Sequence, residues 1–390
     1  MKILIVHDTY YPDVNGAAIF THRLALNLKN RGHDILVIAP STKLKSHYDE
    51  HEGVKSFRVR SFPVLFVNDF RFSPGIFTKS MLKKVVKEFA PDLIHFQGHF
   101  FLSRVVFSIA GKLKIPVMGT NHFMPENLSH YLKMGEKVKS MIESFGWWTF
   151  NRMYKNLTFV TSPTQSAANL LYKNGFSKNV EPISCGIDLE KFNRNQCGKV
   201  DVRKKYSLPD KPIMIFVGRL DREKNVDFVL KAFKEILKII DIHFLIVGKG
   251  TELVRLKELS KELKISNHVT FTGYAPDADL PDLYGISDCF VLACEAELQS
   301  IATMQAMGFG LPVVAVDAVA LPELVHDGEN GYLFKPKDLI GLSESIVKIF
   351  SNDELRAKMG EQSLKIIQKH SINDVMKKYE DLYQNLLKKN

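Results

Sequence analysis

The residues best suited to chemistry lie in the second half of the chain, in the run from Gly218 to Asn225. This run directly follows an apolar segment, Ile213–Val217, and leads into a helical pattern. Arg219 and Lys224 would therefore stand where a buried strand ends and a helix begins. Two cations beside free backbone N–H groups suit the binding of a diphosphate. An ordinary surface loop with cations would give the same pattern, so this run alone does not distinguish a diphosphate site from such a loop.

A second candidate is the segment Cys294–Gly308, which changes from a polar loop into an apolar helix. Glu297 falls in the loop, where a carboxylate can accept hydrogen bonds from sugar hydroxyls. The backbone N–H groups expected to open the helix could face a phosphate; they belong to Leu298, Gln299 and Ser300. An acidic helix cap is the alternative explanation.

The first half contributes two further candidates. Gly16 follows the first apolar run, and without a side chain it lets a loop backbone approach a phosphate closely. His122 lies just past another apolar run, Pro116–Thr120, at the expected end of a strand. A plain turn and a buried structural histidine are the alternatives.

The elements that must position these residues alternate between strand and helix, twice over. The expected strands of the first half are Ile3–His7, Ile35–Ala39, Leu93–Phe96, Pro116–Thr120 and Thr158–Thr161. Those of the second half are Ile213–Val217, Phe244–Val247, Val269–Phe271, Cys289–Leu292 and Pro312–Ala315. Short continuous apolar runs are typical of parallel strands buried on both faces. We therefore predict an α/β protein of two doubly wound parallel-sheet domains, with ligands at the carboxyl ends of the strands in a cleft between them.

The domain boundary is expected near Pro182–Phe192. The first domain then spans residues 1–185 and the second spans 186–371. A last helix, in residues 372–390, is expected to pack back on the first domain.

Together with the Gly186-Ile187-Asp188 turn and Phe192, these motifs resemble the retaining glycosyltransferases of the GT-B fold (family 4-like). In that family an Arg-x4-Lys pair holds the donor diphosphate, and a Glu-x7-Glu segment holds the sugar and the ribose. Arg219 and Lys224 match the pair, and Glu297 matches the first glutamate. Gln305 replaces the second, and although an amide still hydrogen-bonds ribose hydroxyls, the charge is lost.

The resemblance implies a role for each candidate. His122 and Glu297 would act at the donor sugar. The diphosphate would contact Gly16, Arg219, Lys224, Leu298, Gln299 and Ser300, and the nucleoside would contact Gly248, Tyr274 and Gln305. The implied reaction moves glucose or mannose from a UDP- or GDP-sugar with retention of configuration. It implies no cofactor, no metal and no dedicated enzymatic nucleophile, because the departing diphosphate itself takes the acceptor proton.

The acceptor is expected from charge and aromatic content. Residues 1–185 carry 24 Lys and Arg against 13 Asp and Glu, a net of +11, whereas the remainder has a net of −1. Residues 130–157 mix cations with aromatics, namely Lys133, Lys137, Lys139, Arg152 and Lys155 with Trp147, Trp148, Phe150 and Tyr154. This mixture suits an anionic bilayer surface, although a packed amphipathic helix or a solvated basic face is the alternative.

Residues 122–131 resemble the acceptor-side region of diacylglycerol glucosyltransferases, and phosphatidylinositol mannosyltransferases are a near alternative. We therefore expect a lipid acceptor, with a glycan as the alternative, and an enzyme peripheral to the inner face of the plasma membrane. No nucleic-acid partner is expected.

Several other classes are disfavoured. Four cysteines without a Cys-x-x-Cys pair, and no apolar run long enough for a signal or a membrane span, favour the cytoplasm. No Gly-x-Gly-x-x-Gly follows Val6, which argues against a dinucleotide dehydrogenase. Zinc at His95, His99, His122 and His130 is rejected, because the first two fall on strand and loop and no Glu follows His95. A nucleotide-sugar 2-epimerase and a non-catalytic nucleotide-sugar-binding protein stay open, the latter because of Gln305.

Overall fold

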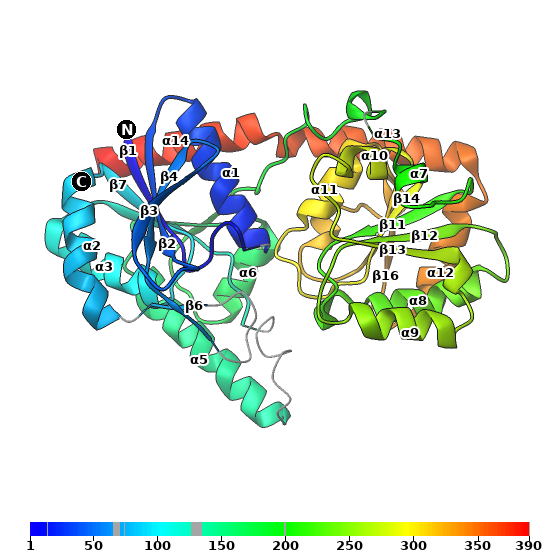
Figure 1. The fold of residues 1–390 in the computed structure, drawn as a ribbon, viewed down its shortest axis with the longest axis horizontal. Helices are drawn as coiled ribbons and strands as arrows, with labels where there is room; N and C mark the ends of the chain where they lie inside the picture. The colour runs from blue at the N-terminus through cyan, green and yellow to red at the C-terminus, as the bar shows by residue number, and fades with distance from the viewer. Residues whose placement is uncertain (14, 65–70, 74, 126–134, 199, 390) are drawn as a thin grey trace. The chain divides into compact units, whose positions relative to one another are not determined.

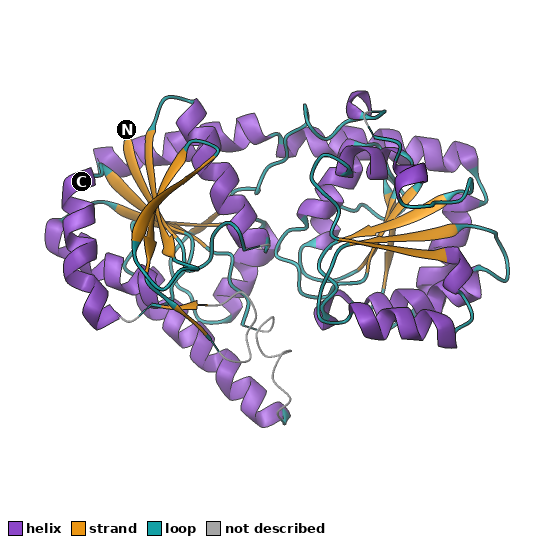
Figure 2. Cartoon of the chain, in the orientation of Figure 1, coloured by secondary structure: helices purple, strands orange, loops and turns teal. Residues whose placement is uncertain are grey.

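The computed structural model describes residues 1–390 apart from 14, 65–70, 74, 126–134, 199 and 390. The chain divides into two units (Figure 1): Met1–Cys185 with Val375–Asn390, and Gly186–Asp374. Each unit has a central sheet with helices on both faces (Figure 2). The predicted α/β class with two doubly wound sheets is confirmed.

The sheet of the first unit has the strand order β10-β9-β8-β7-β1-β2-β4-β3. Its strands are β1 (Lys2–Val6), β2 (Asp34–Pro40), β3 (His47–His51), β4 (Val54–Val59), β7 (Leu93–Phe96), β8 (Val117–Thr120), β9 (Phe159–Ser162) and β10 (Val180–Pro182). All neighbours pair in parallel except β3 and β4, which form an antiparallel hairpin. β5 (Phe62–Pro63) and β6 (Arg71–Phe72) form a separate antiparallel pair. The strand order reverses between β7 and β1, the point at which doubly wound sheets bind ligands.

The helices of the first unit are α1 (Gly16–Asn30), α2 (Gly75–Phe89), α3 (Phe101–Leu113), α5 (Glu136–Tyr154), α6 (Gln165–Lys173) and most of α14 (Ile372–Lys388). α1 buries Leu24 and Leu28, whereas Ile19 is exposed. The helical period places Ile19 well off that face. From α14, Tyr379 and Tyr383 are fully buried in the first unit. The last helix therefore supplies core residues to the unit that begins the chain.

The sheet of the second unit has the order β13-β12-β11-β14-β15-β16, and every pair is parallel. Its strands are β11 (Ile213–Val217), β12 (His243–Val247), β13 (Val269–Gly273), β14 (Cys289–Leu292), β15 (Val313–Val316) and β16 (Gly331–Phe334). β11, β12, β14 and β15 are buried almost throughout, as expected of central parallel strands. Here the order reverses between β11 and β14.

The helices of the second unit are α7 (Val202–Lys205), α8 (Val226–Ile236), α9 (Leu253–Glu262), α10 (Leu280–Gly285), α11 (Ile301–Gly308), α12 (Leu339–Phe350) and α13 (Asp353–Ile367). α8 buries Val229, Phe233 and Ile236, which recur at helical spacing. It ends at Ile236, and Ile239 just beyond it is exposed. Among the described helices, none combines the length and apolarity needed to cross a bilayer.

Candidate functional site

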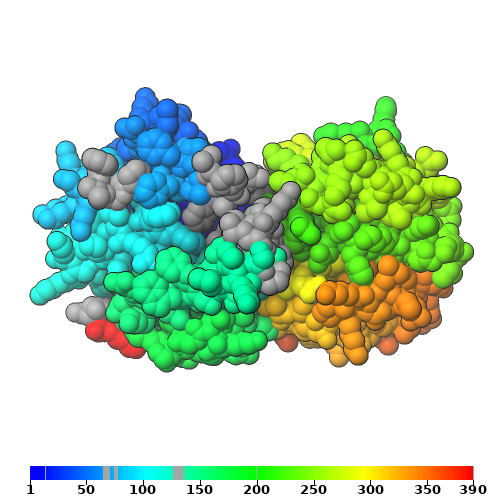
Figure 3. Space-filling view, turned by 90° about the horizontal axis from the view of Figure 1, so that it is seen from below, coloured from blue at the N-terminus to red at the C-terminus, as the bar shows by residue number. Residues whose placement is uncertain are grey.

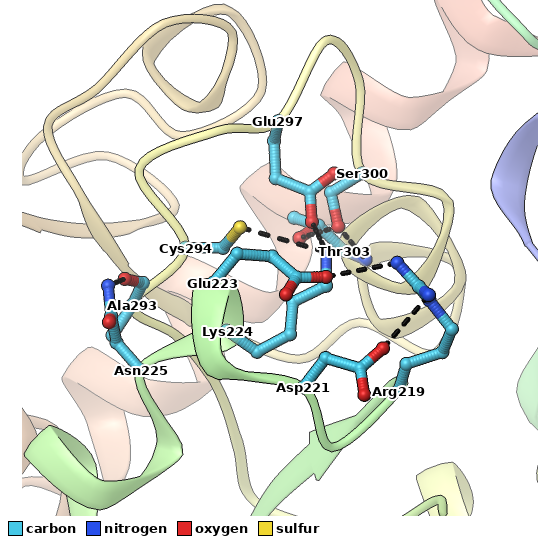
Figure 4. Close-up of polar contacts among 10 residues, drawn as sticks. All are labelled: Arg219, Asp221, Glu223, Lys224, Asn225, Ala293, Cys294, Glu297, Ser300 and Thr303. Atoms are coloured by element: carbon cyan, nitrogen blue, oxygen red, sulfur yellow. Dashed lines mark hydrogen bonds and ion pairs between the residues drawn. The ribbon is translucent and has the colours of Figure 1, made fainter. Parts of the chain in front are cut away.

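The candidate residues of the second unit come from two loops at the carboxyl edge of its sheet. Arg219 and Lys224 lie between β11 and α8, and Glu297 lies between β14 and α11 (Figure 4). β11 and β14 are neighbours, and the strand order reverses between them. The two motifs, more than 70 residues apart in sequence, therefore meet at the switch point of the sheet.

Lys224 and Glu297 form an ion pair, with Nζ of the lysine 2.5 Å from Oε1 of the glutamate. Their side chains are only 16% and 15% exposed, so the pair is largely screened from water. Burial acts to lower the pKa of Lys224, but Cys294, whose Sγ lies 3.6 Å from Nζ, and Glu297 outweigh it, and the net shift is upward. Burial also raises the pKa of the Cys294 thiol to about 12. At neutral pH the thiol is therefore uncharged, and Lys224 keeps its charge.

Arg219 is held by two carboxylates that the sequence analysis did not single out. Its guanidinium lies 2.9 Å from Oδ2 of Asp221 and 3.0 Å from Oε1 of Glu223. Oδ1 of Asp221 also accepts hydrogen bonds from the backbone N–H and the hydroxyl of Thr251, at 3.1 and 2.9 Å. Asp221 thus fixes Arg219 and joins its loop to the loop after β12. The sequence shows acids alternating with Arg219 and Lys224, but it does not show which cation they pair with.

The guanidinium of Arg219 remains accessible beside its two carboxylates. It carries five N–H groups in a planar fork that suits phosphate oxygens. Its side chain is 34% exposed, so it is accessible to a ligand from solvent. The loop can therefore present one accessible cation in a fixed orientation, beside a second cation already paired with a carboxylate.

Glycines allow the loop after β12 to lie against the loop after β11. At Gly248, which has a φ of +144°, an added Cβ would lie 1.8 Å from the carbonyl oxygen of Gly218. At Gly250 it would lie 2.3 Å from the carbonyl oxygen of Leu220. Gly248 thus has a packing role whether or not it contacts a nucleoside. The backbone N–H of Gly248 donates to the carbonyl oxygen of Gly273 at 2.9 Å, and the next residue, Tyr274, is 56% exposed, which leaves it accessible for stacking on a base.

The structure corrects the start of the helix after β14. The sequence predicted that it opens at Leu298, but α11 begins at Ile301 with Ser300 as its N-cap. The hydroxyl oxygen of Ser300 accepts from the backbone N–H of Thr303 at 3.2 Å, the usual contact of a serine cap. Leu298 and Gln299 therefore precede the helix, and their proposed phosphate contacts cannot be those of a helix N-terminus.

Gln305, which stands in place of the expected second glutamate, lies on α11 and is partly buried. Its Oε1 accepts a hydrogen bond from the hydroxyl of Tyr284 at 3.0 Å. Burial raises the pKa of Tyr284 well above its usual range, so this phenol stays a neutral donor. The amide N–H groups of Gln305 are then the polar groups that it can offer to a ribose hydroxyl.

In the first unit, Gly16 is the first residue of α1. The side chain of Asn15 caps this helix by accepting from the backbone N–H of Ala18 at 2.9 Å. Among the described residues, no atom lies within 4 Å of a Cβ added at Gly16, and its φ is not positive. The fold described here thus does not itself demand a glycine at this position.

His122 lies just past the carboxyl end of β8, which pairs with β7 in the first sheet. Its Nε2 lies 3.0 Å from Oε1 of Gln97, and its ring packs against Phe20 at 4.7 Å between centroids. Burial lowers the pKa of His122 to about 3. At neutral pH the ring is uncharged, so it can hydrogen-bond a sugar hydroxyl but cannot supply a positive charge.

Two buried amides beside His122 were missed by the sequence analysis. Within the described chain, Nε2 of Gln97 and Nδ2 of Asn121 have no hydrogen-bond partner. Both side chains are almost fully buried, and both directly follow buried strands. Polar residues just past an apolar run were the available signal.

The other histidines considered for zinc have different surroundings. His95 lies in β7, with its ring nitrogens 2.9 Å from the hydroxyl of Tyr383 and 2.8 Å from that of Thr120. His99 follows in a loop, so the two are on strand and loop as predicted. His130 and Lys133 lie outside the described residues.

Two family models match the chain, one for each half. The model described as "Glycosyltransferase Family 4" matches residues 14–191, and the model described as "Glycosyl transferases group 1" matches residues 199–366. Between them they cover the second sheet, the first sheet apart from β1, and both candidate loops of the second unit.

Curated relatives and solved structures agree with these models. The chain is 30% identical to the alpha-monoglucosyldiacylglycerol synthase of Streptococcus pneumoniae over 86% of this chain and 75% of the relative. It is 24% identical to a GDP-mannose-dependent alpha-(1-6)-phosphatidylinositol monomannoside mannosyltransferase of Mycolicibacterium smegmatis over 92% and 91%. Sucrose-phosphate synthase from Thermosynechococcus elongatus has a similar fold, with a TM-score of 0.81 at 20% identity over the whole of both chains.

Proposed function

Because the chain belongs to the family 4 glycosyltransferases, which have the GT-B fold, we propose that it transfers a hexose, with retention of configuration, from a nucleotide-diphosphate sugar to a hydroxyl group of a membrane lipid. Glucose as the sugar and a diacylglycerol as the acceptor are favoured by the name of the pneumococcal relative. The name of the mycolicibacterial relative instead favours mannose as the sugar and a phosphatidylinositol glycolipid as the acceptor.

The contact between Lys224 and Glu297 carries the donor part of the proposal. It joins the two motifs assigned to the diphosphate and to the sugar, so both parts of one donor can be bound at one place. On donor binding, a phosphate would take the place of Glu297 beside Lys224. The carboxylate would then be free to accept hydrogen bonds from sugar hydroxyls.

The chemistry needs little more from the second unit. When the glycosidic bond to the nucleotide breaks, negative charge grows on the departing phosphate, and Arg219 and Lys224 stabilise it where it develops. Asp221 and Glu223 hold Arg219 in place beforehand, which reduces the reorganisation that this stabilisation requires. The departing phosphate takes the proton of the attacking hydroxyl.

The edge of the first unit suits a neutral acceptor. His122 is uncharged at neutral pH, and the N–H groups of Gln97 and Asn121 lack partners within the described chain. Uncharged N–H groups of this kind can donate hydrogen bonds to hydroxyl oxygens. We assign the acceptor hydroxyl to this edge; for His122 this replaces the contact with the donor sugar that the resemblance implies.

Helix α5 supplies the contact with the bilayer. Val138, Met141, Phe145 and Trp148 recur at helical spacing on one face and are 43%, 72%, 63% and 54% exposed. Phe145 and Trp148 stack with 5.7 Å between ring centroids, and Figure 1 shows α5 extending out from the sheet of its unit. In Figure 3 this segment, turquoise to green, forms part of the surface.

The structure corrects the expected role of one tryptophan. Trp147 is buried and packs against Phe123 and Phe150, so it does not insert into a bilayer. Successive residues of a helix point about 100° apart, so Trp147 and Trp148 could not both lie on the apolar exposed face. Trp148, which has Arg152 5.3 Å from its ring, is therefore the tryptophan assigned to insertion into the bilayer. Lys137, Lys139 and Lys155 add charge that favours an anionic, inner-leaflet surface.

A product screen tests this proposal. The protein is incubated with UDP-glucose, UDP-galactose, GDP-mannose or GDP-glucose, with and without vesicles of dioleoylglycerol in phosphatidylglycerol, and products are identified by NMR. We expect one donor to give an α-linked glycolipid only with vesicles present. A free isomerised sugar without acceptor would identify an epimerase, and binding without turnover would identify a non-catalytic binding protein.

A further inference from the structure

Three side chains on the first unit converge that the proposed donor and acceptor sites do not use. His22 lies on α1, and His51 and Glu52 lie at the turn between β3 and β4. One ligand atom from each lies within 4.8 Å of the others. Almost 30 residues separate His22 from the turn, so no spacing motif in the sequence announces this cluster.

The surroundings fix which atoms point into the cluster. Nδ1 of His22 lies 2.9 Å from the hydroxyl of Tyr10, and Nε2, on the other side of the ring, lies 2.8 Å from Oε2 of Glu52. Histidines that bind metals characteristically have the second ring nitrogen hydrogen-bonded in this way. Tyr11 stacks on the ring of His51 at 3.7 Å and 8°, which holds the plane of that imidazole.

We propose that His22, His51 and Glu52 bind a divalent transition-metal ion, with Zn²⁺ as the natural occupant. Two imidazole nitrogens and one carboxylate oxygen form a donor set that zinc prefers, whereas Mg²⁺ and Ca²⁺ prefer oxygen alone. Ligand atoms around a four-coordinate zinc lie about 3.3 Å apart, so the cluster closes with a shift of at most about 1.5 Å. Glu52 is 56% exposed, which leaves room for water as a fourth ligand.

Metal binding would connect three elements of the first unit. The ligands join α1 to the β3–β4 hairpin, and Tyr10 and Tyr11 place the β1–α1 loop against both. Arg58, from β4, donates to the carbonyl oxygen of Tyr11 at 2.6 Å and lies 4.8 Å from the ring of Tyr10. An ion at this site would therefore restrain the loop that leads to Gly16.

The site is distinct from the histidines that the sequence analysis considered for zinc, since it uses none of His95, His99, His122 and His130. It is also independent of the proposed sugar transfer, because its test measures metal binding and not turnover.

The test is a Zn²⁺ titration of the full-length, tag-free protein after chelator treatment, by competition with a zinc-sensitive dye. The decisive variants are H51Q and E52Q, because each removes one ligand with little change of volume. The matched control is H326Q, which alters the His326–Glu329 pair of the second unit, where the ring nitrogen lies 3.3 Å from a carboxylate but no second histidine joins.

We expect one Zn²⁺ per chain in the wild-type protein and in H326Q, bound with equal affinity. Both ligand variants should bind it at least tenfold more weakly, while their metal-free thermal unfolding stays like that of the wild type. Co²⁺ in the wild-type protein should show the visible absorption of a four-coordinate nitrogen–oxygen site, and E52Q should weaken it. Equal zinc affinity in wild type, H51Q and E52Q would overturn the proposal. Should H51Q unfold, the exposed E52Q decides by itself.

Discussion

The carboxyl edges of the two sheets use opposite electrostatics. In the second unit the edge is ionic, with Arg219 and Lys224 each paired to carboxylates. In the first unit the histidines of the edge are uncharged at neutral pH, because burial lowers the pKa of His7, His99 and His122 to about 3, and the amides of Gln97 and Asn121 stand beside them. The same doubly wound topology thus builds one edge fit for a dianionic phosphate and another fit for an uncharged hydroxyl.

The largest expected effect comes from breaking the ion pair of the second unit. Lys224→Met and Glu297→Gln should each lower turnover by about 100-fold or more, since removing one preorganised group that stabilises developing charge typically costs this much. Lys224→Met should also weaken binding of the nucleoside diphosphate, whereas Glu297→Gln should spare it. Turnover and calorimetric titration measure the two quantities.

The control for this pair is Lys231→Met, which removes an exposed cation of α8 and should change neither turnover nor binding. If Glu297→Gln reduces diphosphate binding as much as it reduces turnover, Glu297 acts by holding Lys224 and not by holding the sugar.

Next in size is the contribution of Arg219. Arg219→Ala should weaken binding of the nucleoside diphosphate by about 10- to 100-fold, because a hydrogen bond to a charged group contributes about 1.5–3 kcal/mol. Arg222→Ala, three residues along the same loop and exposed, should have little effect. Equal losses of affinity in the two variants would mean that the loop binds the diphosphate through its overall positive charge and not through a specific contact with Arg219.

Because the buried histidines at the edge of the first sheet are uncharged in the folded protein, we expect acid to destabilise the first unit. His99 is neutral when folded, with a pKa near 3, but titrates near 6.5 when unfolded, so the unfolded state binds more protons between these values. The free energy of unfolding should therefore fall as pH drops through this window, by up to about 1.4 kcal/mol per pH unit for this histidine. His99→Phe should remove that part of the slope and preserve the aromatic contacts with Phe100 and Phe123.

Tryptophan fluorescence during urea unfolding measures this effect, because both tryptophans of the chain lie on α5 in the first unit. His326→Phe, at an exposed site in the second unit, is the control and should leave the slope unchanged. An unaltered slope in His99→Phe would mean that His99 is protonated in the folded protein.

A smaller effect is expected at the membrane. Replacing Met141, Phe145 and Trp148 by serine should weaken binding to anionic liposomes at all salt concentrations, since apolar insertion is not screened. Replacing Lys137, Lys139 and Lys155 by glutamine should weaken it mainly at low salt. Serine at Val254 and Ile340, equally exposed in the second unit, is the control. No liposome binding by the wild type at low salt would make a soluble acceptor the better proposal.

The smallest effect should come from Gln305→Glu. A carboxylate there can still accept from Tyr284 and would add charge toward the ribose, so nucleotide binding should tighten a few-fold, within the range of about 0.5–1.5 kcal/mol for one hydrogen bond. Calorimetric titration with the nucleoside diphosphate measures it. Unchanged affinity would show that Gln305 does not face the ribose.

Much of the fold could be predicted because its central strands are buried on both faces. Each of the ten expected strands matches a strand of the structure to within about two residues. The hairpin strand β3 was missed because its side chains are polar and mostly exposed, so no apolar pattern marks it. The start of α11 was misplaced because Ser300, and not Glu297, provides the cap.

The candidate site was predictable only in part, for a physical reason. Arg219, Lys224 and Glu297 lie in short loops directly after buried strands, so strand prediction places them. Asp221 and Glu223 were overlooked because their importance depends on side-chain pairing with Arg219, which sequence spacing does not reveal. The cluster of His22, His51 and Glu52 depends on the hairpin meeting α1, a contact between distant segments.

The most direct test of the central claim, that a nucleotide diphosphate binds at the switch point of the second sheet, is hydrogen–deuterium exchange with and without UDP or GDP. One of these nucleotides should slow exchange in residues 218–225 and 293–305 of wild-type protein, and Lys224→Met should abolish the protection. Protection confined to other segments, or equal protection in Lys224→Met, would contradict the account.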